Sequence, residues 1–349
     1  MSSVQLTRTR TRTVPRTDGQ PFAVRRFRLL LALGTLGVLA LAVAHLAIGT
    51  VLFSPVEVVA ALLGHPTLPY SRVIVVDLRL PRTLIAMAAG GMLGLSGALL
   101  QAVMRNPLAE PEMTGATSGA VLFAVLWLVG PGHSAELAPL LPLVALAGGL
   151  LACGAVYLLS DRGAGRYLIL VGLLTSAVLR SVTSFVLLIH QEAIGAILMW
   201  LIGSLNARVW AQWNTLWPWA LVALPAGIAC ARWANVLQLG DASGVGLGVH
   251  VNRARVALLI TAALLATAAV SVVGGITFLG LVAPHIARRI VGADARRLFP
   301  ASVLLGAAIL LAADMIAQVV LWPNTLPVGA VLAVVGAPFF LYLLSRRAR

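Results

Sequence analysis

The sequence contains no lysine: each of its 25 basic residues is an arginine. A P-loop nucleotide site needs the lysine of the G-x-x-x-x-G-K-[ST] motif, because that side chain reaches the phosphates. The absence of lysine therefore excludes a Walker A site from these 349 residues. If ATP drives the work of this protein, another subunit has to bind the nucleotide.

Charged residues of both signs are scarce. They make up 10% of the chain, while apolar residues make up 60% and the mean hydropathy is +0.98; water-soluble domains average about 25% charged residues. The apolar runs are about 20 residues long, which suits helices that cross roughly 30 Å of hydrocarbon. The alternation over ~10-residue segments that marks a β-barrel is missing. The composition predicts an all-α, polytopic membrane protein.

Reactive side chains are few. Cys153 and Cys230 lie in separate apolar runs, without the spacing of a disulfide or a metal site. No pair of carboxylates and no Ser/His/Asp set falls on one face, so we expect no catalytic site and no enzymatic activity. No second ligand stands at helical spacing from His285, so we also expect no metal site and no cofactor bound by this chain.

Arginine is abundant at the amino terminus. Seven arginines lie within residues 1–28, a Thr-, Arg- and Pro-rich arm that we expect to be partly disordered. The positive-inside rule accounts for this cluster, together with contact to anionic membrane lipid, and no nucleic-acid partner is implied. The apolar run that follows is too long for a cleavable signal peptide. We therefore expect the arm to be cytoplasmic.

The apolar runs predict ten membrane crossings within a domain that covers 29–345. A shorter apolar helix at about 193–204 is expected at the outer surface or as a segment that dips in and returns. An even number of crossings puts both termini inside, including the basic tail 346–349, and leaves few arginines outside, as the positive-inside rule requires. The predicted crossings are 29–49, 83–103, 115–131, 138–159, 167–189, 214–234, 254–274, 276–291, 299–321 and 327–345.

Glycines recur at close spacing in the second and third crossings. Gly90-x-x-x-Gly94 and Gly115-x-x-x-Gly119 leave room for two helix backbones to approach each other. Such pairs are common in membrane helices, so they identify no particular partner. The pattern favours a compact helix bundle.

Two polar segments interrupt the apolar runs. One contains RLPR at 79–82 and RNPLAEP at 105–111, and the other is GLVAPHIARR at 280–289. Charge and proline are costly within a bilayer unless they lie at its edges or line a path. We therefore expect these segments to carry the function.

With five further motifs, these segments resemble the FecCD type of ABC importer permease over about 70–345. The further motifs are SGALLQ at 96–101, LGDASGVGLGV at 239–249, AAD at 312–314, LPVG at 326–329 and GAPFF at 336–340. The resemblance implies a ten-helix, type II importer permease in the bacterial cytoplasmic (inner) membrane. It also implies three kinds of partner: a second permease, two ATPase subunits that bind ATP inside, and a periplasmic or lipid-anchored binding protein outside.

The resemblance implies uptake of an iron-siderophore complex, haem or vitamin B12. Where many members carry an arginine and a glutamate, this chain has Gln318 and Thr325. These residues are similar to those of one partner in heterodimeric siderophore permeases, so we expect a ferric siderophore, of the ferric-enterobactin kind, and a different homologous chain as second permease. Haem or vitamin B12 is the alternative cargo. An ion-coupled secondary transporter, which needs ionisable groups at mid-membrane, is a more distant alternative.

Arg79 and Arg82 stand at the predicted outer entry of the second crossing. By the resemblance, Arg79 meets a carboxylate of the binding protein, a contact to which the fork of a guanidinium is suited. Arg82 is expected at the same docking surface, with a more structural part. Snorkelling to the membrane interface is the alternative for such arginines.

The segment 235–253 is predicted to lie inside, between the sixth and seventh crossings. By the resemblance it forms short coupling helices that fit a groove on the ATPase, with turns, a helix start and buried apolar contacts supplied by Gly240, Asp241, Val245, Leu247 and Gly248. A second inner contact is expected at His285, Arg288 and Arg289. Hydrogen bonding of a broken helix end is the alternative there.

Arg180 lies in the middle of the fifth predicted crossing, where inserting an arginine costs ~2.5–3.5 kcal/mol. Two interpretations stay open. Arg180 lines the translocation path and attracts an anionic ferric complex, or it pairs with Asp314, which lies at about the same height in another helix. The other residues that we assign to the path are Gln101, Asn106 and Asp314.

Overall fold

The computed structural model describes residues 20–347 apart from 50, 67, 131–136, 138–139, 161–164, 192–193 and 323. All regular secondary structure in these residues is helical, which confirms the predicted all-α class. Most of the arginine-rich arm and the last two residues of the basic tail lie outside the described residues.

The described helices follow the predicted apolar runs to within a few residues at most boundaries. In chain order they are α1 (Gln20–Ala47), α2 (Pro55–Leu62), the π-helix η1 (Val73–Arg79), α3 (Leu80–Val103), the 3₁₀-helix η2 (Pro111–Thr114), α4 (Ala116–Val129), α5 (Leu141–Leu159), α6 (Gly165–Ile189), α7 (Ile194–Ile202), α8 (Trp210–Ala229), α9 (Ala231–Gln238), α10 (Asp241–Gly246), α11 (Val251–Val273), α12 (Leu279–Val291), α13 (Ala295–Val319) and α14 (Val328–Arg347).

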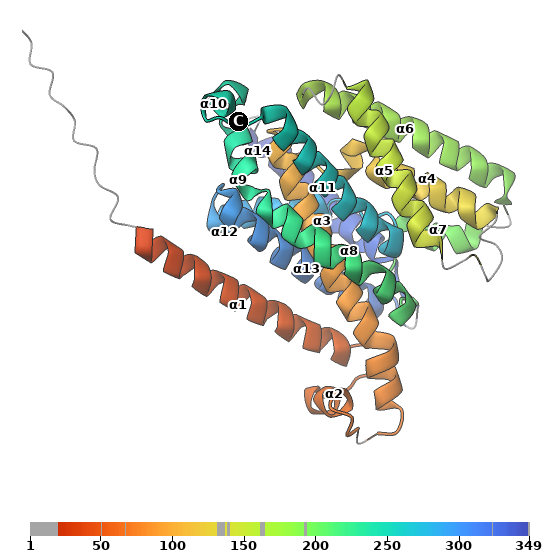
Figure 1. Cartoon of the computed structure of the whole chain (residues 1–349). Coiled ribbons are helices and arrows are strands. Elements are labelled where there is room, and N and C mark those ends of the chain that lie inside the picture. Colours follow the sequence, from red (N-terminus) through yellow and green to blue (C-terminus); the bar gives the residue numbers. More distant parts are fainter. Residues whose placement is uncertain are drawn as a thin grey trace, which may run out of the picture.

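The centre of the bundle is α3, around which α8, α11, α12 and α13 pack (Figure 1). Two of its glycines bring α13 close. A Cβ atom on Gly90 would lie 2.4 Å from the carbonyl oxygen of Gly306, and one on Gly94 would lie 2.4 Å from that of Ser302. The close backbone approach predicted from Gly90-x-x-x-Gly94 is thus confirmed, and the neighbouring helix is α13.

Two breaks between helices pack against each other inside the bundle. One covers 104–115 and contains η2, and the other covers 274–278, between α11 and α12. A Cβ atom on Gly280, in the first turn of α12 directly after the second break, would lie 2.6 Å from Cδ of Pro111 in the first, so the two breaks lie close together. Non-helical backbone is tolerated at membrane depth only where protein or water surrounds it. The breaks are therefore the natural place to look for a polar path.

The second crossing starts earlier than predicted. Instead of an outer loop up to Arg82, η1 runs directly into α3 and gives a continuous helix from Val73 to Val103. Pro81 has no N–H to donate to the preceding turn, and the N–H of Leu80 reaches back five residues to Val75, so a wider π-type turn absorbs the proline. The predicted start of this crossing at residue 83 was therefore wrong, because the helix continues through the proline.

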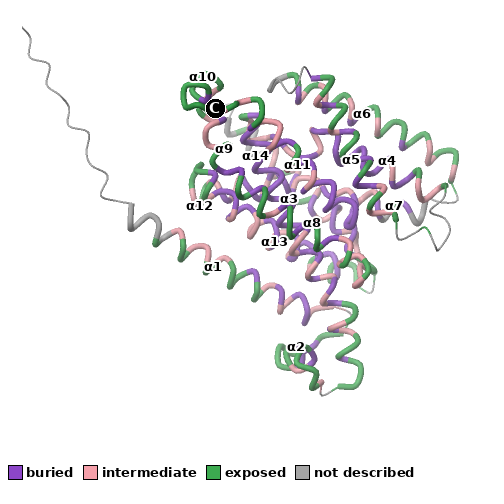
Figure 2. Tube along the Cα trace, viewed as in Figure 1, coloured by how far each residue is buried: buried purple, intermediate pink, exposed green. Residues whose placement is uncertain are grey.

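Exposure is concentrated on α1 and α6. Only 22% of the apolar window of α1 and 17% of that of α6 is buried, and both helices appear mostly green and pink in Figure 2. The exposed side chains are mainly leucine and valine. Such surfaces suit contact with lipid or with another membrane protein.

Among the described residues, six helices are long and apolar enough to cross a membrane, and α8 with α9, bent by 43°, makes a seventh. The other predicted crossings correspond to shorter apolar segments. These include α4, with 14 residues, and α12, with 13. At 1.5 Å per residue, 13 residues span roughly 20 Å, less than the hydrocarbon core. The count of ten crossings stays a prediction.

Candidate functional site

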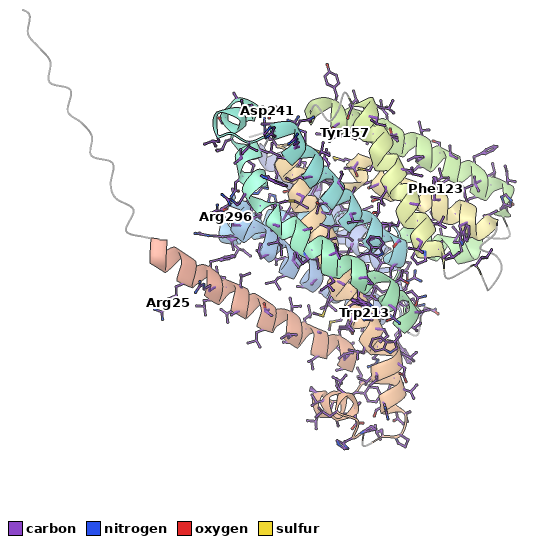
Figure 3. All side chains as sticks on the ribbon, viewed as in Figure 1. Arg25, Phe123, Tyr157, Trp213, Asp241 and Arg296 are labelled. Carbon is purple, nitrogen blue, oxygen red and sulfur yellow. The ribbon has the colours of Figure 1, made fainter. Side chains whose placement is uncertain are left out.

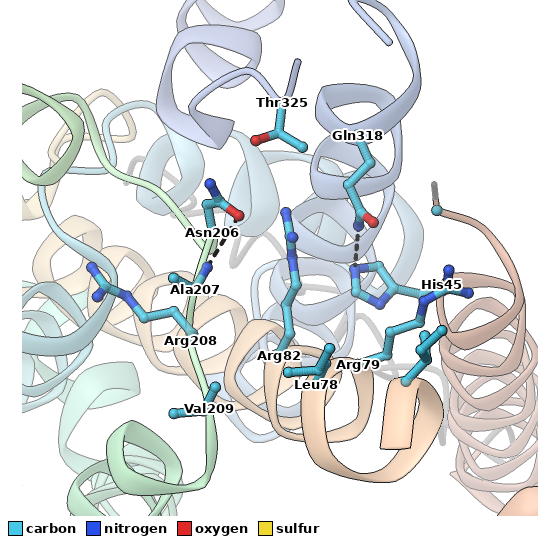
Figure 4. Close-up of a pocket in the computed structure, with 12 residues that line it drawn as sticks. His45, Leu78, Arg79, Arg82, Asn206, Ala207, Arg208, Val209, Gln318 and Thr325 are labelled. Carbon is cyan, nitrogen blue, oxygen red and sulfur yellow. Dashed lines mark hydrogen bonds between the residues drawn. The ribbon is translucent and has the colours of Figure 1, made fainter. Parts of the chain in front are cut away.

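The two ends of the bundle carry different polar groups. We call them the α2 end and the α10 end, after the short helices that lie there (Figure 1). At the α2 end, a cavity of about 410 Å³ opens between the last turn of α1, the start of α3, the end of α13 and the loop after α7 (Figure 4). Its polar lining consists of His45, Arg79, Arg82, Asn206, Arg208, Gln318 and Thr325.

An ion pair that joins α3 to α13 stands at the wall of this cavity. Arg82 donates from Nε to Oδ2 of Asp314 over 2.7 Å and from Nη2 to Oδ1 over 2.8 Å. Asp314 is 1% exposed, so both of its oxygens are removed from water. A two-pronged contact of this kind fixes orientation as well as distance. Arg82 therefore joins two helices, and it also lines the cavity.

His45 adds α1 to the same network. Its Nε2 lies 2.8 Å from Oδ2 of Asp314, and its Nδ1 lies 2.8 Å from Oγ1 of Thr83. Gln318 donates from Nε2 to the same carboxylate oxygen over 3.0 Å. His45 is 1% exposed. We call His45, Arg82, Thr83, Asp314 and Gln318 the His45 network.

Arg79 binds backbone carbonyl groups within this chain. Its Nη1 donates to the carbonyl oxygens of Leu46 and Ala47 over 2.8 and 3.1 Å, and its Nη2 donates to that of Val51 over 2.5 Å. The side chain is buried, with Phe53 5.2 Å from the guanidinium carbon. With these bonds Arg79 holds the chain between α1 and α2, and the docking role predicted for it stays a prediction.

Arg180 forms an ion pair with Glu112 of η2 and not with Asp314. Asp314 is held at the α2 end by Arg82 and His45, so the predicted Arg180–Asp314 pair is wrong. The Arg180 side chain is 47% exposed and that of Glu112 is 28% exposed. Ser176, one turn before Arg180, donates to the carbonyl oxygen of Glu112 over 2.9 Å. The ion pair therefore ties α6 to the break that follows α3.

Gln101 and Arg288, which the sequence assigned to different roles, meet near the α10 end. Nη2 of Arg288 donates to Oε1 of Gln101 over 3.2 Å, and Gln101 is 3% exposed. His285 packs edge-on against Phe339, with ring centroids 5.7 Å apart. Asn106 accepts a hydrogen bond from the N–H of Leu108 and so shapes the turn after α3.

Arg289, in the last turn of α12, is exposed.

Metal-binding side chains form no suitable cluster in the part of the chain that the structure describes. The described residues hold no group of three or more His, Cys, Asp or Glu side chains that suits a metal ion.

The segment predicted for coupling forms a compact knob at the α10 end, where α9, α10 and the start of α11 meet. Gly240 and Gly248, with φ of +110° and +73°, make the turns on either side of α10. Asp241 is the first residue of α10 (Figure 3). Val245 of α10 and its C-cap residue Leu247 are 68% and 62% exposed, so this segment offers apolar side chains to the surroundings.

Two arginines anchor this knob to the bundle. Asp241 pairs with Arg105, from the turn after α3, and with Arg255 of α11, whose Nη2 lies 3.0 Å from Oδ2. Arg105 also donates from Nε to the carbonyl oxygen of Leu237 over 2.7 Å. Partial burial raises the pKa of Asp241, but the hydrogen bonds and charges of Arg105 and Arg255 outweigh it and hold that pKa below its usual range.

Sequence reasoning missed His45, Glu112 and the anchoring role of Arg105. His45 had a signal, because it is a titratable residue within an otherwise apolar run, and such residues mark functional or structural sites in membrane helices. Glu112 had none, because its partner depends on how the break after α3 folds back. Only the fold brings Arg105 and Asp241 together across 136 residues.

Broken helices, a cavity at one end and an apolar knob at the other define a membrane-embedded transport permease. A family model described as the FecCD transport family matches residues 35–346. The chain belongs to this family and is a permease subunit of an ATP-binding-cassette importer.

Individual relatives match most of the chain. The chain is 39% identical, over 92% of its length and 97% of the relative's, to the Fe(3+)-citrate import system permease protein YfmE of Bacillus subtilis. It is 38% identical, over 79% and 74%, to the cobalamin import system permease protein BtuC of Halobacterium salinarum. A solved metal-chelate type ABC transporter in an inward-facing conformation aligns with a TM-score of 0.81 and 27% identity, over 91% of this chain and 99% of that one.

Proposed function

We propose that this chain is one of two permease subunits of a bacterial inner-membrane importer for a ferric siderophore. The observation that carries the proposal is the 39% identity, over nearly the full length of both chains, to an Fe(3+)-citrate permease. Gln318 and Thr325 favour a second permease with a different sequence. Haem and vitamin B12 are the alternative cargoes, the latter because a cobalamin permease is 38% identical.

In this proposal the α10 end faces the cytoplasm, and the knob formed by α9 and α10 docks on a partner ATPase. The apolar, exposed Val245 and Leu247 supply the contact, since apolar side chains at the core of an interface contribute most when they leave water. The arginines Arg288 and Arg289 at the end of α12 form a second contact at the same end. Asp241, locked by two arginines, transmits the movement of the ATPase to α3 and α11.

The α2 end then faces outward and receives the binding protein. Arg82 lines the cavity there together with Asn206 and Thr325 (Figure 4). An arginine whose Nε and Nη2 are held by Asp314 keeps its remaining edge in a fixed direction, which suits a carboxylate of the incoming protein. Such a rim contact sets association rate and register more than affinity.

The translocation path runs along α6 and η2. An ion pair such as Arg180–Glu112, half-exposed on an apolar helix, is costly against hydrocarbon, so this face borders water or the second permease. We assign Arg180 to the attraction of an anionic ferric complex at this level. Gln101 and Asn106 lie on the path towards the α10 end.

The test is uptake in a strain that lacks the gene. Cells complemented with this chain and its partners should accumulate ⁵⁵Fe supplied as ferric siderophores, and not radiolabelled cobalamin or haem. Accumulation of cobalamin or haem alone would reassign the cargo. If the purified chain, reconstituted without any ATPase, drove uptake on an ion gradient, the permease proposal itself would be wrong and the secondary transporter would replace it.

A further inference from the structure

An apolar groove lies between α1 and the bundle, in the half of the molecule nearer the α10 end. It has a volume of about 310 Å³ and is bordered by α1, the end of α12 and α13. Leu31, Val291 and Leu304 are among its lining residues, all of which are apolar or glycine. An apolar space of this kind holds no ordered water, because water needs polar partners, but it does accept apolar molecules.

Two glycines of α1 keep this groove open. A Cβ atom on Gly37 would meet nothing within 4 Å, although Gly37 lines the groove, and one on Gly34 would lie 3.2 Å from Cδ1 of Leu304. The lining residues of α1 run from Phe27 to Val38, which is roughly 16 Å along the helix at about 1.5 Å per residue. This length matches half of the ~30 Å hydrocarbon core, which is the depth of one acyl chain.

The groove is too narrow for a helix of another protein. A volume of about 310 Å³ spread over roughly 16 Å of helix leaves a mean cross-section of roughly 19 Å². An α-helix with its side chains is about 10 Å in diameter and needs roughly 80 Å². A single hydrocarbon chain therefore fits this space, whereas a helix of a second copy of the chain does not.

Arginines surround the end of the groove at which α1 and α13 begin. Arg297, in the first turn of α13, has its guanidinium carbon 6.0 Å from the ring centre of Phe27, which lines the groove. Arg28 of α1 and Arg296 of α13, their neighbours in sequence, are exposed. Figure 3 shows Arg25 and Arg296 at the same end of α1 and α13. Within the described residues, none of these four arginines forms an ion pair.

Asp294, the residue before α13, is an acid beside these arginines. Its Oδ1 accepts hydrogen bonds from Nδ2 of Asn235 over 2.7 Å and from the N–H of Arg296 over 3.0 Å. This carboxylate alone does not balance the four arginines, so the mouth of the groove has a net positive charge. Basic pockets between membrane helices suit the headgroups of anionic lipids.

We propose that this groove binds one anionic phospholipid, with an acyl chain between α1 and α13 and the phosphate held at the mouth by Arg28, Arg296 and Arg297. A guanidinium offers phosphate oxygens a planar fork of donors. Only 22% of the apolar window of α1 is buried by the protein itself, so the bound lipid joins this helix to the bundle. The site is independent of the cargo that the permease carries.

Lipid binding to the purified full-length chain tests this proposal without a transport assay. Palmitoyl-oleoyl phosphatidylglycerol and phosphatidylcholine have the same acyl chains, but only the first has a net negative headgroup. In native mass spectrometry, one phosphatidylglycerol should stay bound, with an affinity at least roughly tenfold above that of phosphatidylcholine. It should also raise the midpoint of thermal unfolding. Equal affinity for the two lipids would overturn the proposal.

Two kinds of variant separate the headgroup contact from the chain contact. Arg296→Gln combined with Arg297→Gln should weaken phosphatidylglycerol binding roughly 25-fold, about fivefold for each lost arginine, and leave phosphatidylcholine binding unchanged. Gly37→Leu should weaken the binding of both lipids, because the added side chain fills the groove. The matched control is Arg72→Gln combined with Arg253→Gln, which removes the same charge from exposed arginines outside the groove and should bind phosphatidylglycerol as the wild type does.

Other occupants of the groove would give different results. If inorganic phosphate binds as tightly as phosphatidylglycerol, the arginines form an anion site without a lipid chain, and the proposal is wrong. It is also wrong if the variant that lacks Arg296 and Arg297 retains wild-type affinity, or if the chain forms a dimer that excludes phosphatidylglycerol. Should Gly37→Leu fail to fold, the arginine variants still decide, because they change side chains at the surface.

Discussion

At the scale of single residues, Arg79 and Arg82 have different structural roles. Arg79 ends α1 by binding three carbonyl oxygens, whereas Arg82 fixes a buried carboxylate on another helix. Two arginines three positions apart on one helix thus have separate partners. The motif RLPR predicted that both matter but not which atoms they bind, because their acceptors come from α1 and α13, distant in sequence.

Arg180 gives the sharpest test at this scale. Arg180→Gln removes the charge but keeps a polar side chain, so we expect normal assembly and a fall of roughly tenfold or more in siderophore uptake, as for one lost charge contact. Uptake and membrane assembly are measured separately. Arg72→Gln, an exposed arginine at the α2 end, is the control and should transport normally. Normal uptake by Arg180→Gln would remove this residue from the path.

At the scale of helices, the boundaries followed from the sequence where apolar runs were long and uninterrupted. α5, α6, α11 and α13 lie where their runs predict. The prediction failed at η1, where a proline sits inside a continuous helix, and left the breaks around η2 and 274–278 undescribed. Local patterns do not contain the long-range packing that stabilises a break, so the fold alone reveals the Arg180–Glu112 pair.

The close crossing of α3 with α12 predicts that a single added methyl group at this crossing destabilises the protein. A Cβ atom on Gly97 would lie 1.7 Å from the carbonyl oxygen of Gly280, where neither backbone can yield cheaply. Gly97→Ala should therefore destabilise the purified protein by about 1–3 kcal/mol or prevent its assembly. Gly37→Ala, on a face of α1 with nothing within 4 Å, should be neutral or stabilising by about 0.5–1 kcal/mol. Thermal unfolding in detergent compares them; equal midpoints would contradict the packing.

The knob at α10 should respond to acid. Because Arg105 and Arg255 lower the pKa of Asp241, the ion pairs are complete at neutral pH and are lost as the pH falls through that lowered pKa. A spin label on Ser243→Cys should become more mobile on acidification. In the Asp241→Asn background the label should be mobile at every pH. If the mobility of the label does not depend on pH in either protein, these ion pairs do not hold α10 in place.

At the scale of the whole molecule, the polar groups divide between the two ends and one exposed helix. Family membership and fold class were predictable, because several separated motifs in the right order are specific and because the composition leaves only a helical membrane protein. The exposed apolar residues of α10 and α6 mark surfaces that this chain does not cover by itself.

Assembly with the ATPases provides a test at this scale. Leu247→Asp places a charge at the exposed apolar end of α10, where Leu247 is the C-cap residue. The ATPase should then no longer copurify, while the permease still folds because the Leu247 side chain is 62% exposed. Ser243→Ala, on the same helix, removes no apolar contact and should leave copurification intact. If the Leu247→Asp variant still copurifies with the ATPase, the contact with the ATPase lies elsewhere on the permease.

The contact between His45 and Asp314 spans 269 of the 349 residues in the chain. The first helix enters the membrane early in synthesis, but the carboxylate that its histidine needs emerges from the ribosome close to the end. The α2 end of the nascent protein therefore cannot reach its final structure until α13 has been inserted. Truncated chains that stop before α13 should leave α1 without its tie and expose it to quality-control proteases.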